Sequence, residues 1–135
     1  MEEEFELKLN SIEISPNDCE ITKPLNIKMK FKMNKTLKEA TWEGQYILDM
    51  THQRHVKHLG VTKNIQYEKD KEYEFEFAVD TIDVEGLHKI LLRNMGLLVL
   101  TLSEGKEMVF KVSCVTTTEQ KGEKYIRHIL NPLEE

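Results

Sequence analysis

The sequence has no long hydrophobic run and no segment that resembles a secretion signal. A membrane-spanning helix needs about 20 consecutive apolar residues, and no run in this chain approaches that length. The segment from Met1 to Glu6 is acidic overall, whereas a secretory signal begins with a basic segment followed by an apolar one. We therefore expect a nuclear or cytoplasmic protein that is not secreted and does not bind a membrane.

Cysteine is scarce, and the motifs of common catalytic and metal sites are missing. Only Cys19 and Cys114 occur, and in a reducing compartment we expect two free thiols rather than a disulfide. The chain has no Gly-rich phosphate loop, no Gly-x-Ser-x-Gly, no His-Glu-x-x-His and no Cys-x-x-Cys. These absences favour a protein that is not an enzyme and uses no cofactor.

An excess of positive charge is also missing. The chain has 24 acidic and 19 basic residues, and its net charge of −5 gives no general attraction to nucleic acid. Its 135 residues fit one domain, and no internal repeat or low-complexity linker divides them. We expect a protein that is monomeric on its own and does not bind nucleic acid directly.

Two strictly alternating segments carry opposite charges. Residues 25–33 place three lysines opposite an apolar face, and residues 72–79 do the same with three glutamates. A period of two is typical of half-buried antiparallel strands, and opposite charges favour the pairing of these two strands in one register. We interpret the lysines as a solvated sheet face rather than phosphate ligands, because lysines already paired with acids release few counterions. The charged residues are Lys28, Lys30 and Lys32 in the first segment and Glu72, Glu74 and Glu76 in the second.

Shorter alternating segments fill most of the remaining chain. The first strand changes phase after Leu9, which predicts a bulge near Asn10–Ser11. A strand from Thr41 places Trp42 where its ring would lie between two sheets, and Gly44 two residues later marks a close approach. Seven or eight short strands with little helix predict an all-β, immunoglobulin-like antiparallel β-sandwich.

We expect at most one short helix, over Asp83–Met95, where Asp83 can cap the helical spacing of Leu87, Ile90 and Leu91. The sandwich is expected to comprise residues 1–118. Residues 119–135 are expected to form a polar tail that docks partly or stays flexible.

Three histidines, His52, His55 and His58, are spaced three apart. On a helix they would share a face and could converge on zinc or a related ion, but on an extended segment they would not. Because such a spacing seldom forms a site without further ligands, we interpret it as a solvated, weakly basic loop and expect no metal.

The hairpin expected from Gly96 to Val115 is the main candidate for a binding surface. Its first strand is apolar on both faces, with Leu97 and Val99 on one of them. Two arrangements are open for the face that carries Leu97 and Val99. Either the Asp83–Met95 segment or the tail covers it, or it is exposed and binds a partner. On the returning strand Phe110 and Cys114 share a face, which makes Cys114 a core or an interface residue.

Several stretches between about Leu7 and Val115 carry a family resemblance. They are Pro24–Leu25 into Phe31, Leu37 to Trp42 followed by Tyr46, Phe75–Glu76–Phe77–Ala78–Val79–Asp80, and Gly96 to Val115 with its turn at Gly105. In this order they resemble the anti-silencing-function family of histone chaperones, whose core is an immunoglobulin-like sandwich.

The resemblance implies two protein-binding surfaces. The family's histone-binding surface uses an apolar residue on the Gly-led strand, which Val99 or Leu97 matches here. It also uses an arginine and a tyrosine on the returning strand, where this chain has Phe110 and Cys114. A second surface takes a basic peptide of assembly factors by strand addition and uses an acidic pair, of which Glu39 is the member that matches.

Two functions follow, and both describe a non-enzymatic protein-binding domain. The first is a protein that resembles a histone chaperone and binds core histones and assembly factors. The second is a cytoplasmic adaptor of the same fold, in a ciliary or cytoskeletal assembly, that does not bind histones. Where the family has an acidic residue, this sequence has Lys57 or a neighbouring histidine, and like charge there would oppose a basic ligand.

Overall fold

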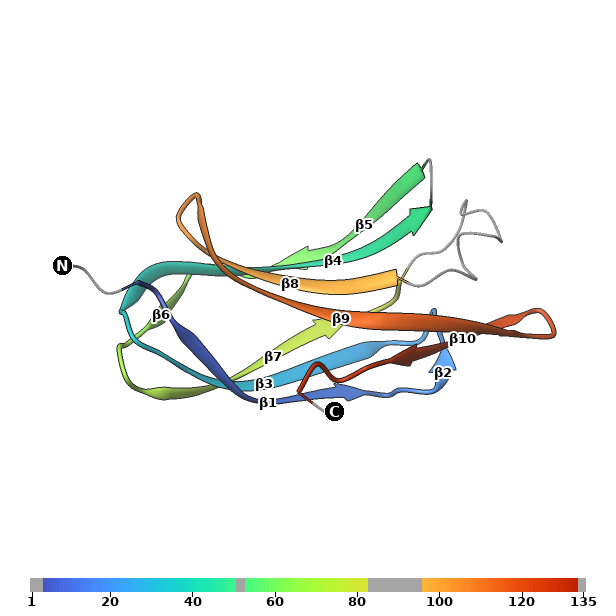
Figure 1. Cartoon of the computed structure of the whole chain (residues 1–135), viewed down its shortest axis with the longest axis horizontal. Coiled ribbons are helices and arrows are strands. Elements are labelled where there is room, and N and C mark those ends of the chain that lie inside the picture. The colour runs from blue at the N-terminus through green and yellow to red at the C-terminus, as the bar shows by residue number, and fades with distance from the viewer. Residues whose placement is uncertain (1–3, 51–52, 83–95, 134–135) are drawn as a thin grey trace.

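The alternating segments form two antiparallel sheets packed face to face in a computed structural model, which describes residues 4–50, 53–82 and 96–133 (Figure 1). This architecture confirms the expected all-β, immunoglobulin-like sandwich. The smaller sheet has the strand order β1 (Leu7–Ser15), β3 (Leu25–Met33), β7 (Glu72–Val79). The helix expected over Asp83–Met95 lies outside the described residues.

The larger sheet has seven strands in the order β2, β10, β9, β8, β4, β5, with β6 paired to β4. Its strands are β2 (Cys19–Glu20), β4 (Leu37–Met50), β5 (Gln53–Val61), β6 (Ile65–Tyr67), β8 (Gly96–Glu104), β9 (Glu107–Lys121) and β10 (Lys124–Ile129). In Figure 1, β4, β5 and β8 form the layer opposite β1, β3 and β7. The core therefore fills the space between two faces that come from widely separated parts of the chain.

The two charged segments are neighbours in the smaller sheet, which confirms the prediction from their alternation. β3 pairs with β7 so that Lys28 lies opposite Glu76, and the two other lysines lie opposite Glu74 and Glu72. The Lys28 Nζ lies 3.1 Å from a Glu74 carboxylate oxygen, a diagonal contact between half-exposed side chains. These charges support the register more than the stability, because exposed ion pairs contribute little.

The bulge in the first strand is also confirmed. The register of β1 against β3 shifts between Leu9 and Ser11, so Leu9 pairs with Phe31 and Ile12 with Met29. Because one extra residue reverses the alternation, Ile12 points into the core instead of into solvent.

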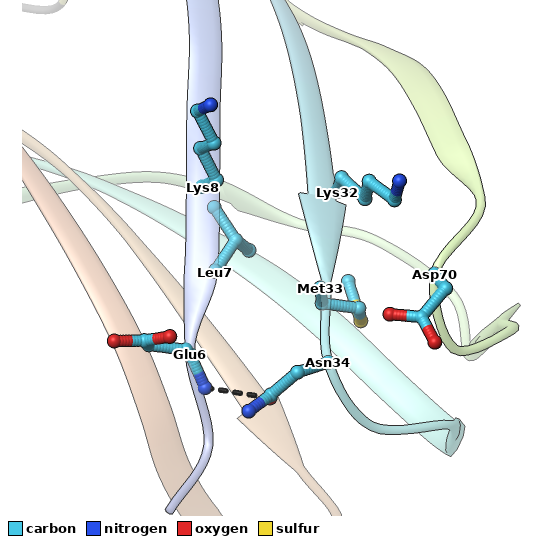
Figure 2. Close-up of a pocket in the computed structure, with 7 residues that line it drawn as sticks. All are labelled: Glu6, Leu7, Lys8, Lys32, Met33, Asn34 and Asp70. Atoms are coloured by element: carbon cyan, nitrogen blue, oxygen red, sulfur yellow. Dashed lines mark hydrogen bonds between the residues drawn. The ribbon is translucent and has the colours of Figure 1, made fainter.

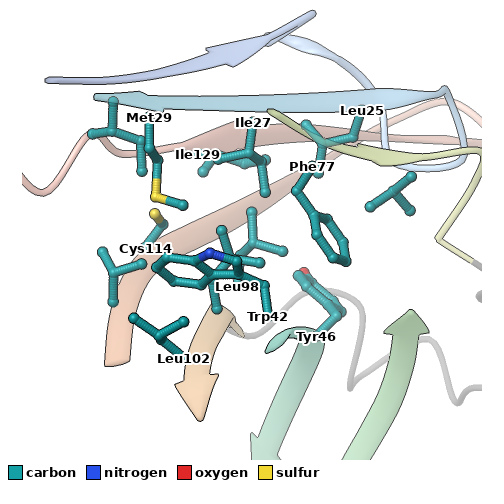
Figure 3. Close-up of a cluster of buried hydrophobic side chains, with 14 of the residues drawn as sticks. Leu25, Ile27, Met29, Trp42, Tyr46, Phe77, Leu98, Leu102, Cys114 and Ile129 are labelled. Atoms are coloured by element: carbon teal, nitrogen blue, oxygen red, sulfur yellow. The ribbon is translucent and has the colours of Figure 1, made fainter. Parts of the chain in front are cut away.

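Trp42 is fully buried at the centre of the core, as its position in the sequence predicts (Figure 3). Its indole Nε1 donates a hydrogen bond to the Tyr67 hydroxyl at 3.0 Å, and its ring stacks on Phe75 at 5.2 Å. A Cβ atom at Gly44 would lie 2.7 Å from Phe77, which explains why glycine occupies that point of close approach.

Residues 119–133, expected to belong to a tail that docks partly or stays flexible, include the end of one strand and all of another. β9 continues to Lys121, and β10 returns along it so that Ile129 lies opposite Thr116. Ile129 belongs to the core, and Arg127 is fully buried. The sequence of this segment suggests a tail because it has few apolar residues and because one of its inward-facing residues is an arginine.

Candidate protein-binding surface

The hairpin of β8 and β9 presents different side chains to its two faces. Leu98, Leu100 and Leu102 belong to the core between the sheets, whereas Leu97 and Val99 lie on the outer face of the larger sheet. The sequence predicts this division correctly. The outer face is therefore where an apolar surface could meet a partner.

Leu97 belongs to a row of apolar residues that crosses this outer face. Ile47 on β4 lies opposite both Val56 on β5 and Leu97 on β8, and Leu97 lies opposite Val115 on β9. The row continues at Leu130, whose N–H donates to the Val115 carbonyl at 2.9 Å. We call these five residues the outer apolar row.

Most of the outer apolar row is accessible. Val56 is 47% exposed, Leu97 38% and Leu130 55%, whereas Ile47 is buried. Val99, on the neighbouring rung opposite Gln45 and Ser113, is also buried although it does not belong to the core between the sheets. Leu97 is thus accessible to a partner, whereas Val99 on the same face is not.

Phe110 and Cys114, both predicted to bind a partner, face the opposite way. Phe110 lies opposite Leu102 and packs edge-on against Trp42 at 6.4 Å, and Cys114 lies opposite Leu98. Cys114 points into the space between the sheets near Met29 (Figure 3), where burial raises the pKa of its thiol to about 11. Neither side chain lies on the outer face, because a residue opposite an inward-facing one also faces inward.

Glu39 lies far from the outer apolar row, at the start of β4. Its N–H and that of Lys38 donate to the two carboxylate oxygens of Glu104, at 3.0 and 3.1 Å. Its carbonyl accepts a hydrogen bond from the Gly105 N–H in the β8–β9 turn. The five predicted residues therefore lie in three places: the outer face, the core and this turn.

Four members of the row were missed by sequence reasoning. Ile47 follows Thr41, Glu43 and Gln45 on the polar phase of its strand, and Val56 lies in a segment too polar to assign. Val115 follows Lys111 and Ser113 on the outward-facing phase of its strand, and Leu130 comes directly after the last residue of β10. They become one surface only when their strands align.

His52 lies outside the described residues, and His55 and His58 belong to a strand rather than a helix. Residues 53–61 form the extended strand β5, in which residues three apart lie on opposite faces. His58 lies opposite Gln45, with its Nε2 3.5 Å from a Glu43 carboxylate oxygen. Within the described parts of the chain, no group of three or more His, Cys, Asp or Glu residues is arranged to hold a metal.

A cleft of about 440 Å³ lies at one end of the smaller sheet (Figure 2). Lys8 and Lys32 lie opposite each other across β1 and β3 at its edge, and Asn34 closes its end by accepting a hydrogen bond from the Glu6 N–H at 2.7 Å. Exposed lysines in an open cleft do not make a built anion site. Its lining residues are Glu6, Leu7, Lys8, Lys32, Met33, Asn34 and Asp70.

The described residues contain no helix that is long and apolar enough to cross a lipid bilayer.

No family model matches the chain, and no curated protein matches its sequence. Solved structures are similar over most of the chain at low identity. A β-glucuronidase of Bacteroides uniformis has a TM-score of 0.48 and 14% identity, over 94% of this chain and 15% of that one. A β-glucosidase 3B of Thermotoga neapolitana has a TM-score of 0.44 and 7% identity, over 92% of this chain and 17% of that one.

A β-glucosidase of Listeria innocua has a TM-score of 0.44 and 18% identity, over 82% of this chain and 16% of that one. The chain thus spans less than a fifth of the length of these three enzymes. These similarities assign neither a family nor an activity to it.

Proposed function

We propose that this chain is a non-enzymatic protein-binding domain that docks its partner on the outer apolar row. The observation that carries the proposal is the alignment of apolar side chains from four strands and the segment after β10 on one solvent-facing side of the sheet. Accessible apolar patches of this kind mark interaction sites more often than chance.

The direction of the row favours a helical partner. Neighbouring strands lie about 4.8 Å apart, so five residues on successive strands span about 19 Å. A helix rises 1.5 Å per residue, so roughly 13 residues of an amphipathic helix would match that length. An apolar helix stripe laid across the strands would contact Val56, Leu97 and Leu130 together.

Among helical partners, the first candidate is a core histone, and the protein would then act as a nuclear or cytoplasmic histone chaperone. The resemblance to the anti-silencing-function family supports this candidate, because Leu97 and Val99 match its histone-binding strand and lie on the outer face. The matches at Phe110 and Cys114 do not support it, since those side chains face the core.

The second candidate is an adaptor in a cytoplasmic assembly, ciliary or cytoskeletal, whose partner is not basic. Lys111 is exposed on the same outer face opposite Thr101, and His58 lies there with its Nε2 3.5 Å from a Glu43 carboxylate oxygen. A basic histone would meet these groups, whereas an acidic or neutral helix would not be repelled.

Binding of purified core histones tests the first candidate against the second. Leu97→Glu places a charge in the centre of the row, and Met108→Glu makes the same change at an exposed residue on the same hairpin outside the row. A histone chaperone would bind histones as wild type and as Met108→Glu, and Leu97→Glu would weaken binding at least tenfold. The adaptor is supported if none of the three proteins binds histones and a different partner is captured only when Leu97 is intact. A partner retained by Leu97→Glu contradicts both candidates.

A further inference from the structure

Four buried polar atoms gather on the inner face of the larger sheet without partners. Across the described parts of the chain, four buried side-chain atoms have no hydrogen-bond partner in good geometry: the hydroxyls of Tyr46, Thr118 and Tyr125, and the Nε of Arg127. Native proteins satisfy most such groups, because each unpaired buried one costs about 1–3 kcal/mol. A cluster of them indicates a site for something that accepts hydrogen bonds.

Arg127 brings a positive charge to this cluster. Its side chain is fully buried, and its two terminal nitrogens donate to four main-chain carbonyls. The carbonyls of Ile21 and Lys23 accept from Nη1 at 3.2 and 2.8 Å, and those of Pro16 and Pro24 accept from Nη2 at 2.9 Å each. The Nε–H is the donor left over.

No carboxylate pairs with this arginine among the residues that the structure describes, and the acidic group that contacts it is the Cys19 thiol. The nearby carboxylates of Asp18 and Glu119 contact the two ring nitrogens of His128, the next residue along β10. Successive residues of a strand point to opposite faces, so the carboxylates that contact His128 lie on the outer face, away from Arg127. Burial lowers the pKa of Arg127, which is the expected cost of a cation without a counter-charge.

The register of the strands places the unpaired groups together. Thr118 lies directly opposite Arg127 across β9 and β10, which puts both side chains on one face. Burial raises the pKa of Tyr46, and both the Thr118 hydroxyl and the Arg127 charge act against that rise, so all three groups are neighbours. A Cβ atom at Gly96 would lie 2.9 Å from the Tyr46 hydroxyl, so a larger residue at this position would clash with that hydroxyl.

We propose that this corner binds a small monovalent anion of the size of chloride, held by the Arg127 Nε–H and the hydroxyls of Tyr46 and Thr118. The site is independent of the proposed protein-binding function, because it lies on the other face of the sheet. An anion accepts hydrogen bonds from all three donors, since hydroxyl hydrogens rotate to suit their partner. It also supplies the counter-charge that a water molecule would not.

Thermal unfolding of the full chain tests the proposal. A ligand that binds only the folded state raises the melting temperature as its concentration rises above its Kd. At constant ionic strength, replacing gluconate by chloride from 1 to 100 mM should raise the Tm by at least about 3 °C. The same Tm in both salts overturns the proposal.

Variants separate a bound anion from a general salt effect. Thr118→Val and Tyr46→Phe each remove one donor and should reduce the chloride-dependent rise in Tm by half or more. Thr117→Val is the matched control, because the Thr117 hydroxyl bonds to the His128 carbonyl and lies on the other face. A rise that is unchanged in Thr118→Val overturns the proposal, even if Tyr46→Phe fails to fold.

A crystal grown or soaked in bromide gives a direct readout. An anomalous peak within hydrogen-bonding reach of the Arg127 Nε supports the site. Only an ordered water at that position, in bromide as in gluconate, overturns it.

Discussion

Leu97 and Leu98 are consecutive residues of β8 that serve opposite faces of one sheet: Leu97 is 38% exposed in the outer apolar row, and Leu98 is 1% exposed in the core. The alternation of the strand makes this division, and it separates residues that are accessible to a partner from residues that pack in the core. The difference can be measured.

Truncation of these two leucines should have very different costs. Leu98→Ala leaves a cavity in the core and should lower the free energy of unfolding by about 2–5 kcal/mol. Leu97→Ala should lower it by less than about 1 kcal/mol, because that side chain keeps much of its contact with water. Urea denaturation of both variants gives the comparison. Equal losses would show that Leu97 is a core residue and not an accessible one.

The lysine and glutamate stripes should be interchangeable as a pair. Lys28→Glu places like charges across β3 and β7 and should lower the Tm, and adding Glu74→Lys should restore part of the loss. The Lys28 Nζ lies 3.1 Å from a Glu74 carboxylate oxygen, and this hydrogen bond raises the pKa of Lys28. Both effects should shrink in about 1 M salt, where charges are screened within a few ångströms. If Lys28→Glu lowered the Tm equally at low and high salt, the loss would come from packing rather than from charge.

Arg127 should be a major source of stability although it lies in the polar last strand. Arg127→Met removes the donors to four carbonyls and should lower the free energy of unfolding by roughly 2–5 kcal/mol. Lys124→Met is the control, since Lys124 is exposed and its Nζ only approaches Glu20 at 3.3 Å. That change should cost less than about 0.5 kcal/mol. Chemical denaturation followed by circular dichroism measures both free energies of unfolding. If Arg127→Met left the free energy of unfolding unchanged, β10 would be dispensable for stability.

Gly44 should not tolerate a side chain unless Phe77 is reduced. The Cβ atom of Gly44→Ala would lie 2.7 Å from the Phe77 ring, and overpacking of this kind costs about 1–3 kcal/mol. The double variant Gly44→Ala with Phe77→Leu should lose less stability than the sum of the two single variants. Additive losses in a double-mutant cycle would show that the two residues are not in contact.

Stability should fall at alkaline pH in a way that depends on Cys114. Burial raises the pKa of this thiol from 9.0 to about 11, so the folded chain holds the proton more tightly than the unfolded chain. The stabilisation is fully present below pH 9 and is lost as the pH rises through 11. Cys114→Ala should therefore flatten the decline of the unfolding free energy between pH 9 and 11. It should not abolish the decline, because burial also raises the pKa of Tyr46 and Tyr67. An unchanged slope would contradict burial of the thiol.

Much of the fold could be predicted from local pattern. The strands at residues 25–33 and 72–79, the bulge after Leu9, the burial of Trp42 and the two free cysteines all follow from alternation or composition. The C-terminal hairpin did not, because β9 and β10 between residues 116 and 129 carry few apolar side chains. Arg127 there reads as a solvated charge until the carbonyls of the residue 16–24 segment are seen around it.

The candidate site was predicted only in part, and Phe110 shows the reason. It shares an apolar phase with Cys114 on a strand whose other phase carries Val109 and Val115, so periodicity alone does not say which face is buried. Pairing with Leu102 decides that Phe110 faces Trp42.

The sequence by itself determined which residues alternate, that the two charge stripes pair and, in strands with one apolar phase, which side faces the core, because these properties depend on neighbours along the chain. Only the tertiary structure decided the outer apolar row and the polar corner beside Arg127. Each member of the row comes from a different strand or from the segment after β10, and in most of those segments a single apolar residue lies among polar ones. Their alignment depends on the register of β5, β4, β8 and β9, and register is a relation between distant segments that no local pattern contains.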